Sequence, residues 1–284
     1  MSNALLASIL RDPAKANTLR PSDWNALFAA ARGELLFGSL AHRLDGIAVP
    51  DAVEPVLADA RLLGQQWARA ATCEGVMAAR ALARLPGKTV LMKGTAYVMA
   101  GLRAGWGRHV GDLDIMVARG DLDHAEKALV GAGWSWVKQD EYDDAYYRRW
   151  MHELPPLVHV GRDKMADVHH TILPLTHRTT PDAEAMLADA VPITRDEPGE
   201  ARLHMLAPAD MLCHCAAHLI ADGDLAGGMR NLWDFHLLFV EFTEADARFA
   251  EALKARARHH GLWPAMHRAA RLSHRLYGTS IPTD

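Results

Sequence analysis

The sequence predicts an α+β fold in which a small mixed β-sheet core is flanked by helical segments on both sides. Three observations support this prediction. Residues 1–85 are rich in alanine and leucine at helical spacing, residues 86–178 contain short apolar runs typical of strands, and the helical pattern returns in residues 179–284. We therefore expect an N-terminal helical segment, an α/β core and a C-terminal helical domain with these bounds.

The N-terminal segment predicts at least two helices. Pro21-Ser22-Asp23 is typical of a helix start. A second pattern runs over 56–85, where apolar residues recur mostly every three or four positions, as one buried helix face requires. Pro55 stands at its beginning, where proline is tolerated.

The core predicts short strands separated by helices and turns. The predicted strands cover 88–92, 112–117, 134–137, 156–160 and 164–171, and a tight turn joins the last two. The first predicted helix follows Lys93-Gly94-Thr95 and runs through Leu102, and the second covers 121–130, with Asp121 available as its N-cap. From Pro181 onward the pattern predicts helices alone, over 208–221, 229–241, 244–259 and 262–277.

Composition limits the class of protein. Apolar residues make up 50% of the chain and charged residues 23%, which is typical of a soluble globular protein. No apolar stretch approaches the about 20 residues that span a membrane, so we expect no membrane partner. The net charge of −4 argues against a protein that coats nucleic acid. Three cysteines are too few for a disulfide framework, and we expect a cytoplasmic protein.

Two carboxylates on one predicted strand are the most informative feature. In Asp112-Leu113-Asp114 the two acidic side chains project from the same face, because residues two apart in a strand share a face. Their mutual repulsion favours a cation between them, and oxygen ligands at this spacing suit Mg²⁺ or Mn²⁺. The alternative is a strand end with solvated aspartates.

The segment Lys93-Gly94-Thr95 lies between a predicted strand and a predicted helix. A glycine there permits close approach of a ligand to the backbone, and a helix start offers free N–H groups to phosphate. The hydroxyl of Thr95 adds a donor. Lys93 either reaches phosphate or is the buried partner of a carboxylate. The alternative for the whole segment is a tight turn.

A third acidic residue follows on a later strand. Asp167 projects from one face of its strand with His169 beside it. Together with Asp112 and Asp114 it completes a trio of carboxylates able to hold two divalent ions. The alternative is an edge strand with a surface aspartate and solvated histidines.

Other polar residues are weaker candidates. Arg108 either clamps a triphosphate with its forked donors or is a solvated loop cation. His214 and His218 share a helix face and either bind a metal or pack inside the helical domain, the latter being favoured. Four further charges near that helix either line the cleft or form a solvated, salt-bridged face: Asp222, Asp224, Arg230 and Asp234.

Three motifs in this order resemble the nucleotidyltransferase superfamily with the polymerase-β-like core. They are Leu91-Met92-Lys93-Gly94, Asp112-Leu113-Asp114-Ile115 and Asp167-Val168-His169. More narrowly, the chain is similar to the bacterial group described as uncharacterised nucleotidyltransferases, over about residues 86–275. Where the superfamily usually has Gly-Ser or Gly-Gly, this chain has Gly94-Thr95, which keeps a hydroxyl.

The resemblance implies an activity and a role for each motif. Gly94 and Thr95 would hold the β- and γ-phosphates of an NTP such as ATP. Asp112 and Asp114 would bind Mg²⁺, and Asp167 would complete the metal site and help to activate the acceptor hydroxyl. The reaction transfers a nucleoside monophosphate to an acceptor and releases pyrophosphate. The acceptor is a small molecule or a peptide or protein; RNA is the least favoured, because of the acidic balance.

Two other functions fit the same residues. One is a non-catalytic accessory protein that binds a nucleotide or a partner protein through this cleft. The other is a metal-dependent phosphohydrolase, which would be built on five residues: Asp112, Asp114, Asp167, His169 and His170.

Overall fold

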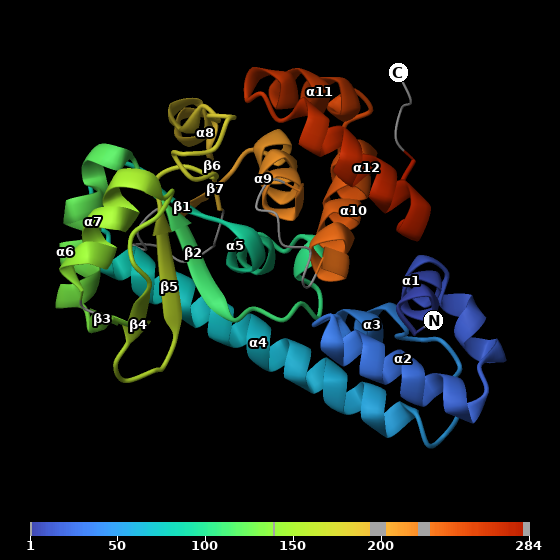
Figure 1. Ribbon diagram of the computed structural model, residues 1–284. Coiled ribbons are helices and arrows are strands. Elements are labelled where there is room, and N and C mark those ends of the chain that lie inside the picture. The colour runs from blue at the N-terminus through green and yellow to red at the C-terminus, as the bar shows by residue number, and fades with distance from the viewer. Residues whose placement is uncertain (1, 139, 194–202, 221–227, 281–284) are drawn as a thin grey trace.

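A seven-stranded mixed sheet forms the centre of the computed structural model, which describes residues 2–138, 140–193, 203–220 and 228–280 (Figure 1). The strand order is β3-β4-β5-β2-β1-β7-β6. The strands are β1 (Thr89–Leu91), β2 (Asp112–Met116), β3 (Trp134–Trp136), β4 (Leu157–His159), β5 (Met165–His169), β6 (Val191–Pro192) and β7 (Leu203–Met205). This arrangement, with helices at both ends of the chain, confirms the predicted α+β class.

The middle of the sheet places the predicted site. β2 pairs in antiparallel fashion with β1 and in parallel with β5, and the second register sets Asp114 directly opposite Asp167. Leu113 and Ile115 are fully buried, so the apolar alternation of β2 holds this strand in the core. Because side chains alternate across a strand, the acidic residues then share the other face.

Helices surround the sheet on both faces. The longest, α4, lies under β2 and carries α1–α3 at its far end, while α9–α12 pack together on the opposite side (Figure 1). The helices are α1 (Ser2–Arg11), α2 (Pro21–Gly33), α3 (Phe37–Arg43), α4 (Glu54–Ala81), α5 (Lys93–Met99), α6 (Leu122–Gly131), α7 (Glu141–Trp150), α8 (Ala183–Asp189), α9 (Pro208–Ile220), α10 (Gly228–Ala245), α11 (Phe249–His259) and α12 (Trp263–Tyr277), with short 3-10 turns at Pro13–Thr18, Arg103–Gly105 and Arg119–Asp121.

The two helical segments are in contact. α1 packs against α12, and one continuous apolar core joins residues from both ends of the chain. Among the helices that the structure describes, none combines the length and the apolar character that crossing a membrane requires. All three cysteines are unpaired.

Three local features differ from the prediction. The chain after Pro181 is not helical alone, because β7 pairs in parallel with β1, and β6 pairs with β7. These strands are two and three residues long, and they form through hydrogen bonds to a distant strand that no local pattern reveals. α7 was not predicted. Asp121 is the N-cap residue of α6 as predicted, but its side chain makes no capping hydrogen bond, because it ends a 3-10 turn in a helical backbone conformation.

Candidate active site

Three carboxylates converge on one face of the sheet. Asp112 and Asp114 come from β2 and Asp167 from β5, and one oxygen of each lies within 4.8 Å of the others. The parallel register explains this convergence, because residues paired across neighbouring strands stand side by side on one face. The structure therefore brings together three acidic residues that are far apart in the chain.

Asp114 is the best compensated of the three. It is 2% exposed, and its Oδ1 accepts hydrogen bonds from Lys93 Nζ at 2.5 Å and from His169 Nε2 at 3.1 Å. Burial alone would raise the pKa of Asp114, but the charge of Lys93 and the contact with His169 hold that pKa far below its usual range. Asp114 is therefore ionised at every physiological pH.

Asp167 is in the opposite state. Burial, followed by the charge of Asp114, raises the pKa of Asp167 to about 7. Its Oδ1 is buried and has no hydrogen-bond partner among the described residues. A buried carboxylate oxygen without a partner is costly, so this position favours a bound proton or a cation.

Lys93 is held above this acidic group in an unusual backbone conformation. Its φ of 47° lies in the left-handed region, which costs a residue with a side chain about 1 kcal/mol or more. The carboxylates of Asp114, Asp112 and Asp167 all act on its ammonium and keep its pKa above the usual value despite burial. The structure pairs Lys93 with a buried carboxylate, and Lys93 also lines the cavity described below.

Gly94 makes room for Arg108. A side chain at Gly94 would collide with the Arg108 guanidinium. Arg108 is 6% exposed and donates Nε to Asp234 Oδ2 at 2.9 Å and Nη1 to the His109 carbonyl at 3.1 Å. It is therefore a buried cation with a fixed partner, and the solvated loop cation that the sequence left open is excluded.

Thr95 lies apart from these cations. Its side chain is buried against α4, near Ala71 and Glu74, and does not line the cavity that Arg108 and Lys93 share. Its hydroxyl oxygen has no hydrogen-bond partner within the described part of the chain. The structure thus brings Lys93, Gly94 and Arg108 together and leaves Thr95 on the other side of α5.

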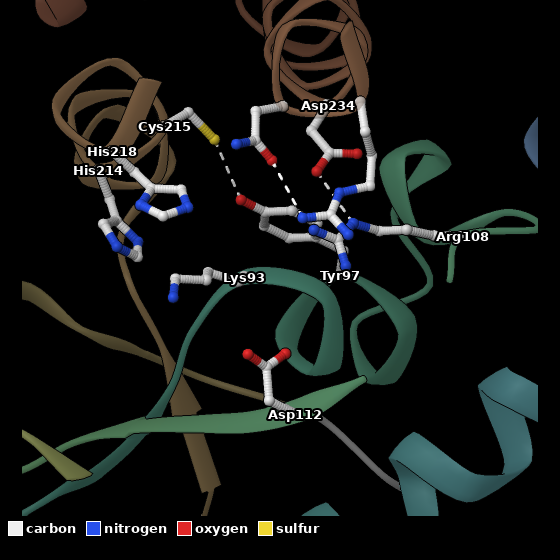
Figure 2. Close-up of a pocket in the computed structure, with 10 residues that line it drawn as sticks. Lys93, Tyr97, Arg108, Asp112, His214, Cys215, His218 and Asp234 are labelled. Atoms are coloured by element: carbon white, nitrogen blue, oxygen red, sulfur yellow. Dashed lines mark hydrogen bonds and ion pairs between the residues drawn. The ribbon is translucent and has the colours of Figure 1, made fainter. Parts of the chain in front are cut away.

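A cavity of about 120 Å³ opens beside the carboxylates. Figure 2 shows Asp112 directed from β2 toward this space, with side chains of α9 and α10 on the far wall. Its lining residues come from both halves of the chain: Lys93, Tyr97, Arg108, Asp112, His214, Cys215, His218, Arg230, Asn231 and Asp234. The cavity therefore joins the sheet to the C-terminal helices.

Arg230 is the least satisfied cation of this cavity. Burial and the nearby charge of Arg108 lower its pKa, and its buried Nε lacks a hydrogen-bond partner in the described structure. Arg230 and Asp234 line the cleft, and Asp234 is salt-bridged to Arg108. Asp222 and Asp224 lie outside the described residues.

The histidines divide between the site and its surroundings. His169 lies between Asp114 and Glu153, whereas His170 directs its Nε2 toward the Met151 carbonyl at 3.3 Å. The five-residue set of a phosphohydrolase is therefore not assembled. His214 and His218 line the cavity with their ring centres 6.3 Å apart.

Glu153 and His152 were not predicted. They lie in a loop after α7 whose sequence has neither the helical nor the strand spacing of apolar residues. The backbone pairing of Glu153 with His169 brings them to β5. A His-Glu dipeptide in a loop is too common to mark a site by itself.

Comparison with known proteins defines the family. No curated protein matches the sequence. A family model described as uncharacterised nucleotidyltransferase matches residues 20–278, which span the sheet, the three carboxylates and most of both helical segments. The chain therefore belongs to the uncharacterised nucleotidyltransferase family.

Proposed function

We propose that the protein is a Mg²⁺- or Mn²⁺-dependent enzyme that transfers a nucleoside monophosphate from an NTP to an acceptor and releases pyrophosphate. One observation carries the proposal: three carboxylates, one of them uncompensated, lie beside a cavity lined by three cations, Lys93, Arg108 and Arg230. Acidic ligands for a metal next to donors for phosphate are what a metal–NTP complex requires.

The acidic residues fit a hard divalent cation. All three candidate ligands are carboxylates, whose oxygens such cations prefer. Oδ1 of Asp167 has no hydrogen-bond partner among the described residues and is free to bind the ion. Asp112, Asp114 and Asp167 would hold the ion. When bound, it neutralises charge that develops on the α-phosphate and the leaving pyrophosphate.

The cationic wall would bind the triphosphate. Arg230 has an unused donor, and Lys93 and Arg108 are fixed by ion pairs to Asp114 and Asp234. A guanidinium offers forked donors that match phosphate oxygens. In this proposal the phosphates contact Lys93, Arg108, Arg230 and the backbone at Gly94, and Thr95 takes no direct part.

Asp167 would receive the proton of the acceptor. Without an ion its pKa is about 7, and a bound cation would keep this carboxylate ionised and able to accept a proton. The acceptor oxygen attacks the α-phosphorus, its proton passes to the Asp167 carboxylate, and the bond from the α-phosphorus to the bridging oxygen of the pyrophosphate breaks. The acceptor is a hydroxyl of a small molecule, a peptide or a protein.

The test uses NTPs labelled on the α-phosphate, with Mg²⁺ and the purified protein. We expect pyrophosphate release and slow labelling of the protein itself or of an added hydroxyl acceptor. Asp112→Asn should abolish both, and Asp59→Asn, which changes an exposed aspartate of α4, should leave both intact. Orthophosphate release from simple phosphoesters would instead indicate a hydrolase. Nucleotide binding without turnover, unchanged in Asp112→Asn and Asp114→Asn, would indicate a binding module.

A further inference from the structure

A second group of metal-ligating side chains adjoins the carboxylates. His152, Glu153 and His169 each place one ligand atom within 4.8 Å of the others. The loop that holds the first two is fixed to β5, because His170 N–H donates to the His152 carbonyl and Leu154 N–H to the Val168 carbonyl. The three side chains therefore meet on a rigid backbone.

His169 faces a carboxylate on each side. Its side chain is 3% exposed, with Nε2 at 3.1 Å from Asp114 Oδ1 and Nδ1 at 3.2 Å from Glu153 Oε2. A carboxylate accepts only, so Nε2 carries the proton toward Asp114. Nδ1 is buried and has no hydrogen-bond partner in the described chain. The distance between Nδ1 and the Glu153 oxygen is typical of two ligand atoms that share one metal ion.

His152 indicates what that cation is. Its ring stacks on His169 with centres 5.3 Å apart and planes at 28°, and its Nε2 lies 3.7 Å from the same Glu153 Oε2. Two imidazoles gathered at one carboxylate oxygen form the nitrogen and oxygen ligand set of a transition metal.

We propose that His152, Glu153 and His169 bind a divalent transition metal such as Zn²⁺, at a site separate from the all-oxygen site of Asp112, Asp114 and Asp167. His152 and Glu153 have side chains 17% and 18% exposed, which gives an ion access from solvent. A metal on Nδ1 fixes the proton on Nε2, and this proton orients Asp114. The inference concerns metal binding alone and does not rest on the proposed transfer reaction.

The test measures metal binding by the full chain after dialysis against a chelator. Zn²⁺ is titrated by calorimetry, and Co²⁺ is followed by the visible absorption that imidazole ligands produce. We expect one tight equivalent in the wild type, in Asp112→Asn and in His124→Ala, which removes an exposed histidine of α6. His152→Ala and Glu153→Gln should each weaken binding by about 100-fold or more, the upper range for a disturbed metal site.

Two results would overturn the proposal. If the wild type binds no more Zn²⁺ than His152→Ala does, His169 is an imidazolium between two carboxylates. If binding persists in His152→Ala and is lost in Asp112→Asn, the ion occupies the carboxylate site. Thermal melting in the presence of chelator checks that the variants fold. If His152→Ala does not fold, the metal binding of the more conservative variant Glu153→Gln decides the test.

Discussion

Two aspartates, the buried Asp210 in the helical bundle and the partly buried Asp167 on the sheet, are in opposite electrostatic states. Asp210 on α9 accepts bonds from Arg256 Nε and Nη2 at 2.6 and 2.7 Å and lies 2.9 Å from His260 Nε2. Burial would raise the pKa of Asp210, but His260 and Arg256 lower it below the usual value. Asp167 has an oxygen with no such partner, and its pKa is raised. The two aspartates therefore differ in the compensation that their described surroundings provide, and that of Asp167 is incomplete.

The difference follows from what each aspartate joins. Asp210 connects α9 to α11, because its carboxylate forms an ion pair with Arg256 that holds the two helices together. Asp167 faces other carboxylates, and its Oδ1 has no hydrogen-bond partner among the described residues. A protein keeps such a destabilising group where function requires it. The following predictions test this contrast, from the largest expected effect to the smallest.

Asp112→Asn should lower nucleotidyl transfer by at least about 10³-fold, equivalent to about 4 kcal/mol in the barrier. Asp112 is exposed, so the melting temperature should stay the same. Steady-state kinetics and thermal melting measure both quantities. Wild-type activity in this variant would show that the carboxylates take no part in the reaction.

Asp210→Ala should cost about 3 kcal/mol of stability, because it leaves the buried His260 and the guanidinium of Arg256 without their carboxylate. Urea denaturation measures the loss. The matched control is Asp189→Ala, which removes the exposed partner of Arg256 and should cost less than about 1 kcal/mol. Equal losses would contradict the structural role assigned to Asp210.

Asp167→Asn should stabilise the protein at about pH 8 in the presence of EDTA, by about 1–2 kcal/mol. The raised pKa means that native Asp167 keeps its proton up to about pH 7, while the unfolded chain releases it near pH 4. The wild type therefore loses stability as pH rises through this window, and the advantage of the variant should vanish toward pH 4. Melting curves over this range test the sign, and an advantage that grows on acidification would refute it.

Arg230→Ala should weaken the binding of a non-hydrolysable NTP with Mg²⁺ by about tenfold, because it removes a charged donor from the cavity. Calorimetry measures the dissociation constant. Arg103→Ala is the matched control, since Arg103 pairs with Glu244 at the surface and should change neither binding nor stability by more than about 1 kcal/mol. Similar effects of the two variants would place the phosphates elsewhere.

The sequence indicates the acidic half of the site more directly than the cationic half, for which it leaves two interpretations of each residue. The alternation in Asp112-Leu113-Asp114 and the strand around Asp167 follow a period that local reasoning detects, and the parallel register brings them together. The wall of α9 and α10 depends on how helices pack across the chain. For Arg230 the sequence therefore leaves open a cleft-lining residue or a solvated charge, and only tertiary contact shows that it lines the cavity.

The side of a helix on which a residue lies also escaped sequence reasoning. Thr95 follows Gly94 directly, yet the side chain of Thr95 packs against α4, whereas Gly94 lies against Arg108. Lys93 begins α5 with a left-handed backbone, which rotates the helix relative to the strand before it. Backbone conformations of this kind are set by the surrounding structure and not by the residue itself.

The ammonium of Lys93 has one more consequence. It is a counter-ion built into the chain, at 2.5 Å from Asp114 and within the field of the other two carboxylates. A newly made chain can therefore bring its acidic strands together without waiting for a dissolved ion, because part of the repulsion is already cancelled. If the site takes the proposed cation, loading would follow assembly, and the concentration of free cation would govern how many molecules are competent and not how many are folded.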